Sequence, residues 1–178
     1  MDRKNEKLIS TLDYKGVIFE LVDCPDVIWV GCVDYASNNS DESDIDATYR
    51  RYSENLADVV KQELINPDNS AALSINYGSK DKPCGIMFAQ ETYSEKQDER
   101  YDVFIQPGSL WLRVRDCKIA AALLGKEEVG LYEYFGLLYK VAEANGYREN
   151  PNMDLAIEYR CHKTHAAYAY IPVIKLAE

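Results

Sequence analysis

Residues 154–174 read DLAIEYRCHKTHAAYAYIPVI, and this stretch decides the class of fold. Two runs rich in aromatic and β-branched residues flank the short polar segment HKTH, which predicts two antiparallel strands joined by a turn. In the first run, apolar residues alternate with small or charged ones, as in a strand with two unlike faces. The two sets are Leu155, Ile157 and Tyr159, and Ala156, Glu158 and Arg160. We expect the apolar set to face the helices and Glu158 to point to the opposite face.

The elements before this strand pair complete the second half of the chain. Residues 101–117, YDVFIQPGSLWLRVRDC, predict a strand pair interrupted by Pro107. A helix is predicted over residues 127–144, and the following Asn145-Gly146 is typical of a helix end. The order in this half is therefore β-α-β-β.

The same order is predicted in the first half. Residues 16–33 are β-rich and broken around Pro25. An amphipathic helix is predicted from about Asp44 to Leu64, because apolar residues recur at three- and four-residue steps. Two short strands follow at residues 71–77 and 85–91. The pattern thus occurs twice, with a period of about 85 residues.

We therefore expect an α+β fold built as a tandem β-α-β-β repeat with a pseudo-two-fold axis. Each half would lay one helix on an antiparallel sheet, and a ligand groove would lie between the halves. Residues 1–15 are interpreted as a polar N-terminal tail and residues 16–178 as a single domain. The halves cover about residues 16–92 and 101–175.

Charge and hydropathy exclude several classes of function. The net charge is -10 and the pI is about 4.7, so the surface would repel a phosphate backbone, and we expect no direct nucleic-acid contact. The acidic runs around Asp44 and Asp98 are interpreted as solvated segments. The sequence has neither an apolar run of membrane-spanning length nor a signal peptide, which predicts a cytoplasmic protein with no membrane partner.

Cysteine and histidine usage gives no metal or cofactor site. The five cysteines are an odd number without CxxC spacing, which argues against a disulfide framework and a zinc ribbon. His162 and His165 form an H-x-x-H pair without further ligands. Nucleotide-binding, P-loop and GxSxG motifs are absent as well. We predict no metal and no cofactor.

Three stretches resemble one known family in order and spacing: PGSLWLRVRD, ANGYRENPNMDLAIEY and AYIPVIK. They are similar to the C-terminal half of the AraC-type effector-binding domain, also called the GyrI-like (gyrase-inhibitory-protein-like) domain. The likeness covers about residues 16–175. The chain has CKIAAALLGKEEV where the family often has His-x-Gly, and Tyr49 or Tyr52 near the place of an early helical Trp.

The resemblance implies a double β-α-β-β fold with a ligand groove at the pseudo-two-fold axis. It also implies a buried glutamate that meets cationic, aromatic or amphipathic ligands, and Glu158 is the matching residue. A carboxylate between aromatic walls attracts a cation, and desolvation raises its pKa. Arg160 is expected on the same face as Glu158, where an ion pair between them would weaken the preference for a cation.

The candidate ligand-binding residues are Glu158 and a set of aromatic side chains. Trp111 alternates with two core-facing leucines, so we expect its ring to turn out of the core, as Glu158 does. Tyr168 and Tyr170 share one face of the last strand. Further candidates for the walls are Tyr134, Trp29 and Phe88.

Three functions stay open from the sequence. The first is a small-molecule sensor, either the effector half of a multidrug-responsive bacterial transcription regulator whose DNA-binding domain lies elsewhere, or a stand-alone relative. The second is a stand-alone hydrolase of reactive small molecules, with Glu158 as general base. The third is a gyrase-inhibitor-like module whose acidic surface engages a protein partner. We favour binding over catalysis because it needs only shape and charge.

Overall fold

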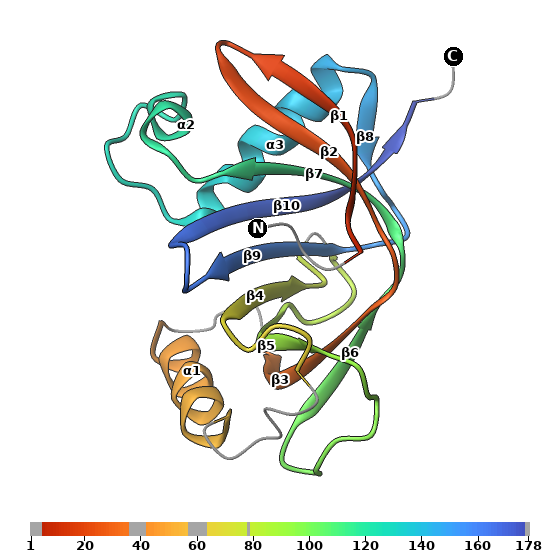
Figure 1. Ribbon diagram of the computed structural model, residues 1–178, viewed down its shortest axis with the longest axis vertical. Helices are drawn as coiled ribbons and strands as arrows, with labels where there is room; N and C mark the ends of the chain where they lie inside the picture. The colour runs from red at the N-terminus through yellow and green to blue at the C-terminus, as the bar shows by residue number, and fades with distance from the viewer. Residues whose placement is uncertain (1–4, 36–41, 57–63, 78, 177–178) are drawn as a thin grey trace.

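The computed structural model describes residues 5–35, 42–56, 64–77 and 79–176. Its strands form one antiparallel sheet (Figure 1). Its strands are β1 (Lys7–Tyr14), β2 (Val17–Cys24), β3 (Val27–Tyr35), β4 (Asn69–Ile75), β5 (Gly85–Thr92), β6 (Asp102–Gln106), β7 (Ser109–Arg115), β8 (Tyr147–Glu149), β9 (Leu155–Cys161) and β10 (Ala166–Lys175). The helices are α1 (Glu42–Leu56), α2 (Lys118–Ala122), the 3-10 turn η1 (Leu131–Glu133) and α3 (Tyr134–Ala144). The α+β class is therefore confirmed.

The sheet has the strand order β1-β2-β7-β10-β9-β4-β5-β3-β6, and β8 pairs separately with β10. Its two central strands are β9 and β4, which come from opposite halves of the chain. The long strands β2 and β3, and likewise β6 and β7, follow one another through a short bend. The two bends lie together, because the amide of Gly108 donates to Asp26 Oδ1 at 2.6 Å.

The N-terminal segment is an element of the sheet, which corrects the interpretation of residues 1–15 as a tail. Residues 7–14 form β1, the edge strand that pairs with β2. The turn between them has positive φ angles at Lys15 (54°) and Gly16 (81°), and the Gly16 amide donates to Asp13 Oδ1. A two-residue turn with two positive φ angles matches the twist of a hairpin. The Lys-Gly pair was the sequence signal for this strand.

Two apolar cores lie on opposite faces of the sheet. The first includes Phe135 and Leu138 of α3, which pack with Ala156 of β9 and Ala169 of β10. The second includes Trp29, Trp111, Tyr159 and Tyr170. In Figure 1, α3 lies behind the upper strands of the sheet and α1 lies beside the lower ones. Both helices contact the face of the first core, which we call the helix face.

The helix boundaries differ from those predicted. The first helix was expected to reach Leu64, but that residue forms an isolated bridge with Thr92 instead. The last part of the predicted range, residues 57–63, lies outside the described residues. The second predicted helix, residues 127–144, begins only at η1, and the short α2 and β8 were not predicted. No helix among the described residues is long and apolar enough to cross a membrane.

Candidate functional site

Glu158 points to the helix face of the sheet, which overturns the expectation that it points away from the helices. Its direct neighbours across the strands are Ala169 of β10 and Ala72 of β4. Ala169 belongs to the core formed with α3, so Glu158 lies on the same face of the sheet as that helix. The larger apolar residues of β9 fill the second core on the opposite face. Alternation separated the two sets correctly, but the larger set does not meet the helices.

A strip of small and polar residues on the helix face is partly open to solvent. Alternate residues of β4 are fully buried, whereas those between them are only partly buried. The partly buried set consists of Ser70, Ala72 and Ser74, which pair with Arg160, Glu158 and Ala156 of β9. We call these six residues the central strip. Four of the six side chains are short, Arg160 is exposed, and Glu158 is the one carboxylate among them.

The Glu158 carboxyl is desolvated without being neutralised by the protein. Burial raises its pKa above the ordinary value, and the charge of Arg160 opposes this shift. Within the described part of the chain, no side chain forms a hydrogen bond or an ion pair with this carboxylate. Arg160 acts on it only through its charge. A carboxylate that has lost water without gaining a partner retains an unmet affinity for a cation or a hydrogen-bond donor.

Aromatic side chains lie beside the central strip and beyond one of its ends. Phe88 of β5 pairs directly with Ala72, and it packs against Tyr49 and Tyr52 of α1 with ring centroids 5.1 and 6.1 Å apart. Beyond the end of β4, Tyr77 packs edge-on against Phe135 of α3, with ring centroids 5.7 Å apart. Flat rings around a carboxylate suit a cation that carries aromatic groups.

Two of the predicted wall residues lie on the same face as Glu158. Glu158 pairs with Ala72, and Ala72 pairs with Phe88 on its other side, so Phe88 lies next to the strip. Tyr134 begins α3 and is fully buried in the helix-face core. Its hydroxyl donates to Asp116 Oδ1 at 2.9 Å. Desolvation and this acidic neighbour raise the pKa of Tyr134, so it is held as a neutral phenol.

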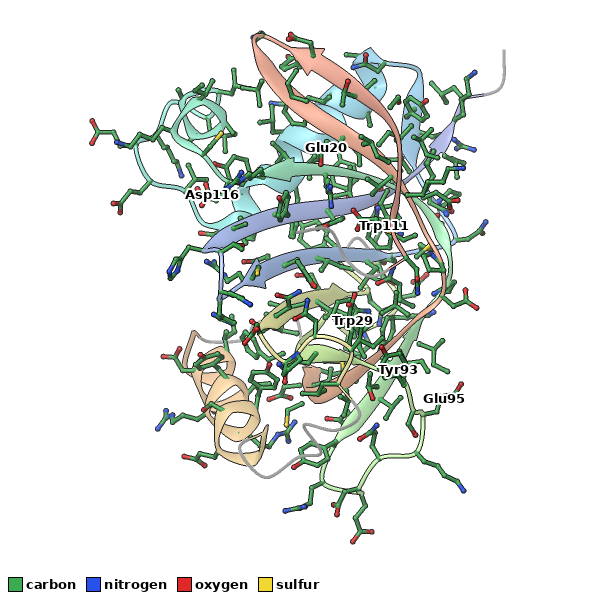
Figure 2. The ribbon with its side chains drawn as sticks, in the orientation of Figure 1. Glu20, Trp29, Tyr93, Glu95, Trp111 and Asp116 are labelled. Atoms are coloured by element: carbon green, nitrogen blue, oxygen red, sulfur yellow. The ribbon has the colours of Figure 1, made fainter. Side chains whose placement is uncertain are left out.

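The other four predicted wall residues lie on the opposite face and are not brought to Glu158. These residues are Trp111, Trp29, Tyr168 and Tyr170, and all pack in the second core. Trp111 does turn away from the helices, but its ring is completely buried rather than turned out of the core. Figure 2 places Trp29 and Trp111 in the interior of the molecule, whereas Glu95 lies at its periphery. The prediction assumed that the face away from the helices is open.

The reason for this error is that the sheet has a core on each face. Trp29 Nε1 donates to Gln106 Oε1 at 2.9 Å, and the ring packs edge-on against Tyr159 at 6.5 Å. Tyr159 in turn packs against Tyr170 at 6.3 Å. A chain of buried rings therefore occupies the second face, and an alternating pattern cannot distinguish it from a pocket wall.

Residues that the prediction missed are Ala72 and Tyr77. Ala72 alternates with buried apolar residues in AALSI, and this pattern of small residues on one strand face was the available signal. Tyr77 lies beyond the end of β4, where Asn76 has a positive φ of 56°. That reversal of the backbone is not visible in the sequence.

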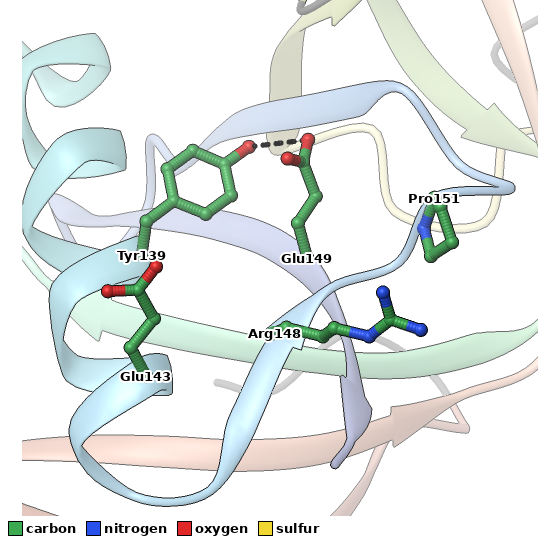
Figure 3. Close-up of a pocket in the computed structure, with 5 residues that line it drawn as sticks. All are labelled: Tyr139, Glu143, Arg148, Glu149 and Pro151. Atoms are coloured by element: carbon green, nitrogen blue, oxygen red, sulfur yellow. Dashed lines mark hydrogen bonds between the residues drawn. The ribbon is translucent and has the colours of Figure 1, made fainter.

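Two surface pockets lie away from Glu158. One, of about 330 Å³, is lined by Tyr139, Glu143, Arg148, Glu149 and Pro151, with the Tyr139 hydroxyl donating to Glu149 (Figure 3). The other, of about 440 Å³, lies between the end of β4, β6 and residues 151–155. The first is lined mainly by exposed charged side chains and the second mostly by apolar residues, and neither includes Glu158, so the central strip stays the candidate site.

The histidines do not form a metal site in the part of the chain that the structure describes. His162 Nε2 lies 2.7 Å from Ser70 Oγ, at one end of the central strip. Among the described residues, no group of three or more His, Cys, Asp or Glu side chains is arranged to hold a metal ion.

The fold can be compared with proteins of known structure. No family model and no curated protein matches the chain. SAV2435, solved with tetraphenylphosphonium bound, superposes with a TM-score of 0.59 at 12% identity, over 88% of this chain and 93% of that one. The C-terminal domain of EcmrR gives 0.61 at 15% identity, over 89% and 98%. The chain shares the fold of these proteins.

A third similar structure is a putative bacterial transcription regulation protein from Staphylococcus aureus. It superposes with a TM-score of 0.57 at 16% identity, over 87% of this chain and 97% of that one. At such identities the likeness concerns the fold. The fold is thus one that small-molecule-binding and regulator proteins use, in agreement with the resemblance noted from the sequence.

Proposed function

We propose that this chain is a small-molecule-binding domain of the AraC-type effector-binding, GyrI-like kind, and that Glu158 holds a cationic, aromatic or amphipathic ligand on the central strip. One observation carries the proposal. Glu158 is desolvated enough for its pKa to rise, yet it has no hydrogen-bond or ion-pair partner among the described residues. A ligand cation would supply the interaction that the protein does not.

The neighbours of Glu158 support a ligand with flat aromatic groups. Ala72 flanks the carboxylate with a single methyl group and is partly open to solvent, whereas Ala169 on the other side is buried in the helix-face core, so a ligand would approach over Ala72. On the side of Ala72, Phe88 and the two tyrosines of α1 form a wall. The binding of tetraphenylphosphonium by SAV2435, which has a similar fold, supports this class of ligand.

We further propose that the domain consists of two halves related by a pseudo-two-fold axis between β4 and β9. The sheet order supports this arrangement. Moving outward from the central pair, one side has β9, β10 and β7, and the other has β4, β5 and β3. In chain order the first half runs β3, α1, β4 and β5, and the second runs β7, α3, β9 and β10 with α2, η1 and the short β8 added. Glu158 lies on the inner strand of its half, so its ligand would lie beside the axis.

We propose that any contact with DNA is made by a partner protein or by another domain, and not by this chain. The net charge of -10 opposes binding of a phosphate backbone. In the described part of the chain, the acidic loop before β6 is exposed, and Asp98 there accepts from Arg100 at 2.8 Å. Under this proposal, ligand binding by the chain would be read by another part of a cytoplasmic regulator.

Two ions of the same shape and opposite charge test the proposal. Tetraphenylphosphonium and tetraphenylborate would each be titrated into the wild type, Glu158→Gln and the exposed control Glu128→Gln, with calorimetry and thermal unfolding as readouts. We expect only the cation to bind. Held at about 100 times its Kd, it should stabilise the wild type by about 2.7 kcal/mol.

We expect Glu158→Gln to bind the cation at least about tenfold more weakly, which corresponds to about 1.4 kcal/mol. Glu128→Gln should bind like the wild type. Equal binding of both ions, or unchanged affinity in Glu158→Gln, would contradict the role given to the carboxylate. No binding by any of the three proteins would contradict the ligand class.

A further inference from the structure

A second charged cluster is buried on the face away from the helices. The side chain of Arg113 is only 4% exposed, and its Nη1 donates to Glu6 and, at 3.0 Å, to the hydroxyl of Tyr170. Its Nε donates to Glu20 at 2.6 Å. The guanidinium carbon lies 4.9 Å from the ring centre of Tyr168 and 5.7 Å from that of Tyr170. A guanidinium among rings is a strong site for a planar anion.

The carboxylate at the centre of this cluster comes from outside the sheet. The side chain of Glu6 is 2% exposed, and it accepts from Arg113, from the Tyr170 hydroxyl at 3.4 Å and from Cys24 Sγ at 3.6 Å. By contrast, Glu20 belongs to β2, pairs directly with Arg113, and is 32% exposed. The cluster therefore contains one carboxylate built into the sheet and one delivered by the N-terminal segment.

The segment that delivers Glu6 leads into a strand that buries little apolar surface at its start. It leads directly into β1, an edge strand whose first residues, Lys7 to Ser10, are all exposed. The pairing of β1 with β2 is interrupted by a register shift between Leu8 and Ser10. Such a bulge leaves a residue out of the ladder and weakens pairing at that end. Little apolar burial holds this end of β1 in place, whereas Arg113 is fixed within the sheet.

We propose that Arg113 is the anchor of a carboxylate-binding site, and that Glu6 is the chain's own occupant of that site. The ligand class is a small aromatic monocarboxylate. Its carboxylate takes the positions of the Glu6 oxygens on Arg113 Nη1 and the Tyr170 hydroxyl, and its ring packs among the tyrosines. Exchange of Glu6 for a free carboxylate releases the start of β1, so this site couples an anionic ligand to the N-terminal segment.

A buried donor on the same face supports this assignment. Trp111 precedes Arg113 by two residues on β7, and its ring packs edge-on against Tyr170 at 6.5 Å. Its Nε1 is buried and has no hydrogen-bond partner in the described residues. Buried polar groups without a partner are rare in folded proteins and costly. A second oxygen or a ring substituent of the ligand would meet this donor. The site is independent of Glu158, since it lies on the other face of the sheet and selects the opposite charge.

Vacating the site with Glu6→Ala in the full chain tests the proposal. Sodium benzoate is the probe, benzamide is its neutral equivalent, and sodium chloride controls for ionic strength. Binding is followed by tryptophan fluorescence, by thermal unfolding and by the NMR signal of the Arg113 Nε–H. We expect Glu6→Ala to bind benzoate at least about tenfold more tightly than the wild type does, because the tethered competitor is gone.

Three outcomes decide between acceptance and rejection. Stabilisation of Glu6→Ala by benzoate but not by benzamide or chloride, with loss of the effect in Glu6→Ala/Arg113→Gln, supports the site. Should Glu6→Ala fold poorly, Glu6→Gln keeps the side-chain volume, and rescue of its melting temperature by benzoate carries the same test. Equal responses to benzoate and benzamide, or no shift of the Arg113 Nε–H signal in either variant, overturn the proposal.

Discussion

Glu158 lies directly opposite Ala72 in the pairing of β9 with β4, at the point where the two halves of the chain meet. Both side chains are partly exposed on the helix face of the sheet. A charged residue thus stands beside the smallest chiral side chain, and Phe88 stands on the far side of that methyl group. If a ligand binds at Glu158 as proposed, the size of residue 72 would determine how close it can come to the carboxylate.

Ala72→Leu should block the site without touching its charge. The added side chain would occupy the space between Glu158 and Phe88, and we expect the affinity for tetraphenylphosphonium to fall at least about tenfold. Ala47→Leu, at an exposed position of α1, is the matched control. Calorimetric titration of both variants checks this. Unchanged affinity in Ala72→Leu would place the ligand elsewhere.

The tyrosine at the edge of the aromatic wall should contribute to binding more than to stability. Tyr49 is 53% exposed and packs on Phe88. Tyr49→Ala should weaken cation binding by about 0.5–2 kcal/mol, the usual range for a cation over an aromatic ring. Tyr132, whose side chain is 61% exposed, lies far along the chain, and Tyr132→Ala serves as the control. Equal affinities of the two variants for the cation would show that Tyr49 of α1 does not contact the ligand.

The raised pKa of Glu158 gives a stability effect with a definite sign. A carboxyl whose pKa is higher in the folded state than its ordinary value of 4.5 favours folding when protonated, and this contribution is lost as the pH rises through the folded-state pKa. Glu158→Gln should therefore gain stability relative to the wild type between pH 4 and pH 7. Urea unfolding at both pH values measures the difference. A gain that is the same at both would show that the carboxyl titrates normally.

Two glycines should respond to alanine with opposite signs. Gly136 lies in α3 with open space around its Cβ position, so Gly136→Ala should stabilise the protein by about 0.8–1 kcal/mol. Gly16 has equal space, but its φ is +81°, and Gly16→Ala should cost about 1–2 kcal/mol. Denaturant midpoints of the two variants test this. A neutral Gly16→Ala would mean that the β1–β2 turn adapts.

Much of the fold was predictable because its signals are local. The strand pairs on either side of Pro25 and Pro107, and the last two strands, lie within a few residues of the expected ranges. Strand β1 was missed because its side chains are mostly exposed, and only the turn at Lys15-Gly16 marked it. The predicted helix limit at Leu64 was wrong because that residue pairs with a strand distant in the sequence, as its bridge to Thr92 shows.

The candidate site was predictable in part. Glu158 was chosen from the family resemblance and Phe88 from its place in the first half, and the structure brings both to one face. Trp111 was chosen because it alternates with leucines, and Tyr170 because it shares a strand face with Tyr168, but a second core buries both. Alternation shows which residues share a face. Whether that face is open depends on residues distant in sequence, such as Glu6, which covers Arg113.

The pairing of β4 with β9 extends without interruption from Asn69 opposite Cys161 to Ile75 opposite Leu155. Because this continuous ladder joins the two halves through backbone hydrogen bonds, we expect the halves to stay together if a ligand binds on the central strip. Any movement on binding would then involve the elements that pack on the sheet, which are α1 against β3 and β5, and η1 with α3 against β9 and β10.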